Sequence, residues 1–160
     1  CTVMNQVDET TRLMNRKCFE KCKKNIKSPA CVLFFDINNF KMINDTYGHA
    51  EGDKVLKFIA GKIFGVYGRY GTCYRIGGDE FCVVMQKGLD KLDIINRAFL
   101  DEIDDVCKMT DRVFGVALGY AFYDKNEASF DGAIKEADEM MYRNKSKCST
   151  GRQMPYESKN

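Results

Sequence analysis

The sequence lacks several features that would point to particular classes of protein. Its 160 residues include only 2 prolines and 1 histidine, and no repeat or Pro/Ser-rich linker divides them. The longest apolar stretch, residues 113–123, is about half the roughly 20 residues that a membrane-spanning helix requires. Lys and Arg number 25 against 23 Asp and Glu, so the net charge is only +2. We therefore predict that this domain neither crosses a membrane nor binds nucleic acid or lipid through its overall charge.

Common catalytic and targeting motifs are absent as well. The sequence has no G-x-x-x-x-G-K-[ST] phosphate loop, no H-E-x-x-H zinc motif and no G-x-S-x-G nucleophile elbow. Residues 1–5 do not begin a signal peptide, because they carry no basic start followed by an apolar run. Because the sequence begins with Cys1, we expect it to be a fragment of a longer protein. We expect a cytoplasmic location, either in a cytoplasmic protein or in the cytoplasmic part of a membrane-bound one.

Eight cysteines are present, and their surroundings favour free thiols over a disulfide framework. Cys31 and Cys82 lie inside apolar runs, where cysteine behaves as a small buried hydrophobic residue. Cys18 and Cys22 are four residues apart on a predicted helix, but a structural zinc site needs four N or S ligands at paired spacings. We therefore predict reduced thiols and no zinc site.

The length and the 44% hydrophobic content fit one soluble domain, which we take as residues 1–160. Apolar periodicity predicts interleaved helices and strands. The predicted strands are 30–35, 72–76, 81–86 and 113–122; the predicted helices are the later part of 8–25, a short turn at 40–45, one with Val55, Leu56, Ile59, Ile63 and Phe64 on one side, 92–106, and 129–147 capped by Ser129. This pattern predicts an α+β fold with a central, mostly antiparallel sheet flanked by helices.

Carboxylates gather where two predicted strands meet. Asp36 is predicted to close the buried strand 30–35, and Asp79 and Glu80 open the strand that follows Gly77-Gly78. If these strands pair, the carboxylates converge, and hard oxygen ligands at one edge favour Mg²⁺ completed by phosphate oxygens. That arrangement is typical of metal-assisted phosphoryl transfer. The alternative is that Gly77 to Glu80 form only a solvated hairpin turn.

Polar residues that follow Asp36 fit a nucleotide. A short helix opens at Asn38 to Lys41, so its free backbone N–H groups and the lysine can hold phosphate oxygens; alternatively Asn38 is an ordinary N-cap and Lys41 a solvated lysine. Asn44 and Asp53 flank a predicted break at Gly48 to Gly52, and their amide and carboxylate match the edge of guanine. Their alternative role is helix capping.

These residues form part of a sequence that resembles a known family. The segment 75–81, Arg-Ile-Gly-Gly-Asp-Glu-Phe, resembles the motif that names the GGDEF domains, the bacterial diguanylate cyclases, and 35–53 resembles the second block of that family. Further matches are Asp8, Thr11, Leu13, Asn15, Arg16 and Phe19 in the opening block, and Ala137, Asp138, Met141, Tyr142 and Lys145 in the closing helix. The resemblance therefore covers nearly the whole domain.

The resemblance implies a palm-like sheet related to nucleotidyl cyclases and the condensation of two GTP into cyclic di-GMP and two pyrophosphates. Asp36, Asp79 and the Ile37 carbonyl would hold two Mg²⁺ ions, which Mn²⁺ can replace. Glu80 would activate the ribose 3′-hydroxyl or serve as a further metal ligand. The guanine-reading residues would be Asn44 and Asp53, and the phosphate-holding groups Lys41, Lys145 and the backbone of Asn39 and Phe40. Each domain would bind one GTP, so a homodimer would be needed, regulated by an upstream sensory domain.

Departures from the family pattern leave an alternative open. Thr10 and Arg12 replace the usual Leu and Gly, and Asn38 stands where Asp is common. The closing segment is longer than the family pattern, which weakens the match of Arg152. Gly68 and Gly71 occupy the places of the family's inhibitory R-x-x-D, so we expect no product feedback by that route. The alternative function is a catalytically silent GGDEF module that binds GTP or dimerises to relay a signal.

Overall fold

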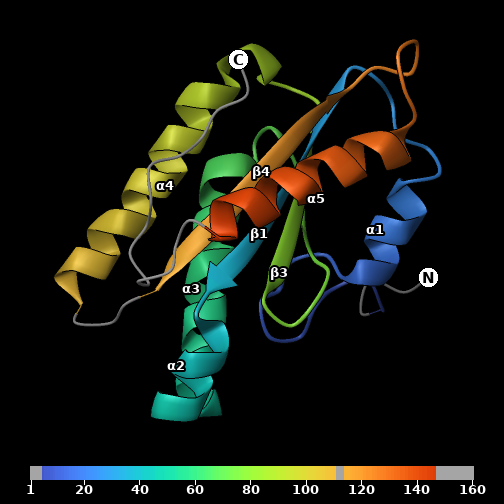
Figure 1. Cartoon of the computed structure of the whole chain (residues 1–160). Coiled ribbons are helices and arrows are strands. Elements are labelled where there is room, and N and C mark those ends of the chain that lie inside the picture. Colours follow the sequence, from blue (N-terminus) through green and yellow to red (C-terminus); the bar gives the residue numbers. More distant parts are fainter. Residues whose placement is uncertain (1–4, 111–113, 147–160) are drawn as a thin grey trace.

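The structure, a computed structural model, describes residues 5–110 and 114–146. Helices and strands are interleaved along the chain (Figure 1). In order they are α1 (Arg16–Cys22), β1 (Ala30–Asn38), α2 (Phe40–Tyr47), α3 (His49–Tyr67), β2 (Gly71–Arg75), β3 (Glu80–Met85), a 3₁₀ turn (Leu89–Lys91), α4 (Leu92–Met109), β4 (Gly115–Tyr123) and α5 (Phe130–Ser146). The predicted α+β class is confirmed.

The four strands form one sheet in the order β2-β3-β1-β4, and all neighbours are antiparallel. β1 lies inside the sheet and is buried along its whole length, as its unbroken apolar run predicts. The prediction that Asp36 closes this strand is wrong. Pairing with β4 continues through Ile37 and Asn38, so Asp36 lies within the strand and is flanked by partners on both sides.

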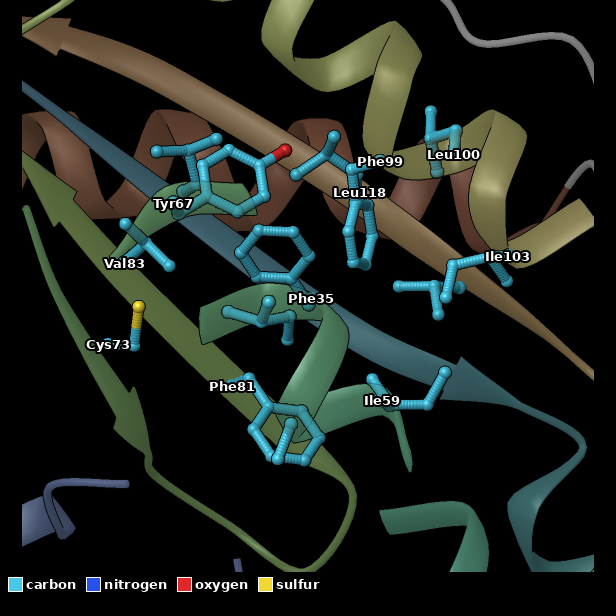
Figure 2. Close-up of a cluster of buried hydrophobic side chains, with 14 of the residues drawn as sticks. Phe35, Ile59, Tyr67, Cys73, Phe81, Val83, Phe99, Leu100, Ile103 and Leu118 are labelled. Atoms are coloured by element: carbon cyan, nitrogen blue, oxygen red, sulfur yellow. The ribbon is translucent and has the colours of Figure 1, made fainter. Parts of the chain in front are cut away.

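Helices α3 and α4 cover one face of the sheet and supply the larger hydrophobic core. Figure 2 shows Phe35 of β1 next to Tyr67 of α3 and Phe99 of α4, and its ring centroid lies 5.4 Å and 5.3 Å from theirs. Phe64 was expected on the buried side of α3, but it is 63% exposed. Tyr67, one turn after Ile63, fills the inward position instead.

Helices α1 and α5 cover the opposite face (Figure 1). α5 packs directly onto β4 at Gly119, where a Cβ atom would collide with the carbonyl oxygen of Ala137. Ser129 caps α5 as predicted, because its Oγ accepts the N–H of Gly132 at 3.0 Å. The predicted end of this helix at Lys147 lies outside the described residues, as does Val113 at the predicted start of the last strand.

The junction between α2 and α3 differs from the prediction. The break is confined to Gly48, which has a φ of 91°, and α3 begins at His49. Gly52 and Asp53 therefore lie inside α3, so Asp53 does not cap it. Asn38 is not the N-cap of α2 either; Asn39 takes that position with a left-handed φ of 59°.

The described cysteines, six in number, are all free, in agreement with the predicted thiols. Burial raises the pKa of the Cys73 thiol to about 12, which keeps it in the unreactive protonated form. Within residues 5–110 and 114–146, no helix combines the length and the apolar character needed to span a bilayer.

Candidate active site

The predicted convergence of carboxylates is present at one end of the sheet. β1 and β3 pair with Asp36 opposite Glu80, and the Ile37 N–H donates to the Asp79 carbonyl oxygen at 3.2 Å. This register follows from the hairpin: Gly77 and Gly78 let β2 turn back, and β3 then pairs with β1 from Glu80 onward. Backbone pairing thereby brings Asp36 next to Asp79 and Glu80, which lie far from it in the sequence.

Asp36 is the most buried member of this group, with only 3% of its surface exposed. Its Oδ2 accepts a hydrogen bond from Lys145 Nζ of α5 at 2.7 Å. Its Oδ1 is fully buried and has no hydrogen-bond partner among the described residues. A buried carboxylate oxygen without a partner is costly, so this atom is suited to a cation that the protein chain itself does not supply.

The neighbouring carboxyl groups hold protons more tightly than usual. Partial burial, together with the adjacent Asp36 carboxylate, raises the pKa of Asp79 to about 6. The pKa of Glu80 is also raised, first by burial and then by the negative charges of Asp36 and Asp138. Mutual repulsion of this kind is relieved when a cation binds between the groups.

The donor set fits a hard divalent ion that is completed from outside the chain. Asp36 and Asp79 provide carboxylate oxygens, and Ile37 follows Asp36 in β1 with its N–H bonded to the Asp79 carbonyl oxygen. Mg²⁺ takes about six oxygens and commonly keeps phosphate oxygens among them. Among the described residues, no three His, Cys, Asp or Glu side chains form a metal-holding group on their own.

Arg75 supports the turn that carries Asp79, a role that the sequence reasoning missed. Its Nη2 donates to the Gly78 carbonyl oxygen at 2.7 Å and its Nε to that of Gly77 at 3.1 Å. Its Nη1 forms an ion pair with Asp8 at 3.1 Å. Both Arg75 and Asp8 lie in segments that resemble the family motifs, so the sequence could have singled them out. Their contact could not be predicted, because only the fold brings positions 67 residues apart together.

The predicted guanine-reading residues lie on two helices, Asn44 on α2 and Asp53 near the start of α3. Asn44 lies against Gly52, because a Cβ at position 52 would collide with Asn44 Oδ1. The structure thus brings Asn44 next to the residue that precedes Asp53. Asp53 itself is exposed, and so is Lys41 on α2.

A groove of about 540 Å³ adjoins the carboxylates beside α5. It is lined by Asp36, Glu80, Asp138, Glu139, Met141, Tyr142, Arg143 and Lys145. Lys41, Asn44 and Asp53 are not among its lining residues. A second pocket, of about 580 Å³, lies between α1 and the β2–β3 strands and contains none of the candidate site residues. Of these two pockets, only the first is lined by Asp36 and Glu80 of the carboxylate group.

Two further expectations concern regulation and phosphate binding. Gly71 starts β2 so close to β3 that a Cβ atom would collide with the Val84 carbonyl oxygen. The absence of product feedback stays a prediction. Arg152 lies outside the described residues.

Comparison with known proteins places this arrangement in one family. A family model described as "Diguanylate cyclase, GGDEF domain" matches residues 5–150. The chain is 30% identical to diguanylate cyclase DgcN of Escherichia coli over 86% of its own length and 36% of that protein. It is 28% identical to cyclic di-GMP phosphodiesterase NbdA of Pseudomonas aeruginosa over 89% of its length and 19% of that protein.

The solved structures agree with the sequence comparison. The GGDEF domain of YfiN (TpbB) from Pseudomonas aeruginosa superposes with a TM-score of 0.71 at 29% identity, covering 92% of this chain and 99% of that one. The chain spans 18% to 42% of the length of the curated relatives that it matches. The chain belongs to the GGDEF domain family, whose members include diguanylate cyclases.

Proposed function

We propose that this domain is a diguanylate cyclase that condenses two GTP molecules into cyclic di-GMP and two pyrophosphates. The observation that carries the proposal is the buried Asp36 carboxylate with one unpartnered oxygen, placed beside Asp79 and Glu80. A carboxylate with no ligand to bind would stay in water, because burying one of its oxygens without a hydrogen-bond partner is costly.

Each residue would have a distinct role. Asp36, Asp79 and the Ile37 carbonyl would hold two Mg²⁺ ions, which when bound neutralise triphosphate charge and make the α-phosphorus easier to attack. Glu80, with its raised pKa, would accept the proton of the ribose 3′-hydroxyl. Lys145 would donate to phosphate oxygens from α5.

Helices α2 and α3 would contact both the phosphates and the base of the nucleotide. Lys41 and the backbone N–H groups of Asn39 and Phe40 would hold phosphates at the start of α2. Asp53 would accept hydrogen bonds from N1–H and N2–H₂ of guanine, with Asn44 beside it. These roles follow from the family resemblance and agree with the exposed positions of Asp53 and Lys41.

One domain would supply only half of the reaction. Each 3′-hydroxyl would attack the α-phosphorus of the GTP on a facing copy, so turnover requires a homodimer. An upstream sensory domain would control that pairing. The free thiols agree with a reducing compartment such as the cytoplasm.

The test is incubation of the domain with GTP and Mg²⁺, followed by chromatography of the nucleotides. The domain is assayed alone and fused to a dimerising coiled coil, because dilution of a monomer would otherwise mask turnover. We expect cyclic di-GMP and pyrophosphate from the fused protein and none from the same protein with Asp36→Asn. GTP binding without product in the fused protein would favour the silent module instead.

A further inference from the structure

The contact between Lys145 and Asp36 joins one buried partner to one that reaches solvent. Lys145 Nζ lies 2.7 Å from Asp36 Oδ2, yet the Lys145 side chain is 47% exposed and that of Asp36 only 4%. A lysine side chain carries a positive charge at neutral pH. The lysine therefore acts as a cation bound to the carboxylate that we assign to the metal.

The backbone that carries Lys145 is held firmly, so only its side chain is free to change partner. α5 approaches β4 at Gly119 so closely that no Cβ atom fits between them. The neighbouring Asn144 donates from Nδ2 to the Leu118 carbonyl oxygen at 2.6 Å. These contacts fix the end of α5 next to Asp36 and leave a long, flexible side chain to reach either the carboxylate or the groove.

We propose that Lys145 is an internal cation that occupies Asp36 in the nucleotide-free domain, so that a divalent ion binds there weakly until a triphosphate draws the lysine away. This inference rests on the proposed function. A lysine ammonium and a divalent ion at one carboxylate repel each other at close range. Phosphate oxygens offer the lysine an alternative anionic partner in the groove that it already lines.

The consequence is coupled binding of metal and nucleotide. Without nucleotide, the metal must displace Lys145 and binds with few protein ligands. With nucleotide, the lysine moves to a phosphate, Asp36 is released, and phosphate oxygens complete the metal coordination. Nucleotide and metal therefore strengthen each other's binding by the same factor.

The experiment measures Mn²⁺ binding to the purified domain by electron paramagnetic resonance, without nucleotide, at about pH 8, where carboxyl groups are ionised. Lys145→Gln and Lys145→Met are compared with wild type. The matched control is Lys135→Gln, which removes the same charge from the same helix at a residue that lines the neighbouring groove with Glu80 and Asp138. We expect about tenfold tighter Mn²⁺ binding in both Lys145 variants, and no more than about a twofold change in the control.

The titration is then repeated with a GTP analogue that cannot release pyrophosphate. The advantage of the Lys145 variants should disappear or reverse, because the lysine has left Asp36 in the wild type and the variants lack its phosphate contact. Equal Mn²⁺ affinity of wild type and Lys145→Gln without nucleotide would overturn the inference, and so would an equal gain in Lys135→Gln. If Asp36→Asn bound Mn²⁺ with the analogue as tightly as wild type, the metal assignment in the proposed function would fail as well.

Discussion

The two regions that we assign to the nucleotide are built in different ways. At the sheet end, Asp36 is buried and ion-paired, Glu80 is its partner in the strand register, and Arg75 holds the turn that carries Asp79. On helices α2 and α3, Lys41 and Asp53 are exposed, and Asn44 lies against Gly52. The first region is fixed by backbone pairing and side-chain bonds, whereas the second depends on helix packing around one glycine.

This difference indicates a division of labour. A metal site needs its oxygens held in place before the ion arrives, because disordered ligands add an entropic cost. The sheet end meets that need, but at the expense of crowding negative charges. A base-reading region needs only a few polar groups on a firm surface, which the first turns of a helix provide. The predictions below test whether the two regions differ in this way.

The largest effect is expected from the metal ligands. Asp36→Asn and Asp79→Asn should each reduce cyclic di-GMP formation by at least about a thousandfold, because each removes a charged metal ligand while keeping the side-chain shape. Circular dichroism and thermal melting would check that both variants stay folded. A variant that retains near wild-type turnover would contradict the assignment of that residue.

A smaller loss should follow from Glu80→Gln. If Glu80 accepts the 3′-hydroxyl proton, the amide should lower turnover by roughly a hundredfold or more while GTP still binds. Turnover and GTP affinity are measured on the same preparation, the latter by equilibrium binding. Joint loss of GTP and Mn²⁺ binding would instead identify Glu80 as a metal ligand.

The sheet end was largely predictable from sequence because strand order and motif position determine it. A buried run ending near Asp36 and a glycine turn before Asp79 supported the hypothesis that the carboxylates meet if the two strands pair. The exact end of β1 was not predictable, since Ile37 and Asn38 extend the strand only because β4 pairs with them. That pairing joins residues far apart in the chain, which no local pattern reports.

The helical region was predicted less well for a similar reason. We predicted one break from Gly48 to Gly52 because two glycines lie close together there. Only Gly48 is non-helical, and Gly52 lies within α3. Gly52 stays inside α3, where the absence of a side chain leaves room for Asn44. The local sequence pattern does not reveal this contact. Phe64 was assigned to the core from spacing alone, whereas the packing of α3 against the sheet favours Tyr67.

At the helical region, Asp53→Ser should relax the choice of base. ATP presents Asp53 with an unprotonated N1 and no 2-amino group, so the charged acceptor would be left unpaired beneath a bound base that covers it. Such an unpaired group costs about 1 to 3 kcal/mol or more, which corresponds to a preference for GTP of roughly tenfold to several hundredfold. A serine hydroxyl can donate as well as accept. Cyclic dinucleotide products are measured in equimolar ATP and GTP. Unchanged selectivity in the variant would remove Asp53 from the guanine site.

Gly52→Ala tests the same region without changing any polar group. The added methyl would displace Asn44, so we expect about a tenfold higher KM for GTP with metal binding at the sheet end unchanged. The matched control is Gly61→Ala on the same helix, where a Cβ meets nothing within 4 Å. The control should keep the wild-type KM and gain about 0.5 to 1 kcal/mol of stability. Equal KM values for the two variants would show that the position of Asn44 is unimportant for GTP.

The smallest expected effect is the stability cost of crowding charge at the sheet end. The folded-state pKa of Asp79 is about 6, above the ordinary value of 3.8. The folded domain therefore binds more protons than the unfolded chain between these values, and its free energy of unfolding should fall as the pH rises through about 4 to 6. Because Asp79 is partly exposed, we expect a loss of only about 1 kcal/mol.

Urea unfolding of the metal-free domain across this pH range measures that loss, and Asp79→Asn isolates it, because the amide does not titrate. The difference in unfolding free energy between the two proteins should shift in favour of Asp79→Asn as the pH rises. Added Mn²⁺ and GTP analogue should reduce the shift for the wild type, since the bound cation offsets the repulsion. Parallel pH profiles for the two proteins would mean that Asp79 carries no electrostatic strain, and the contrast between the two regions would then rest on geometry alone.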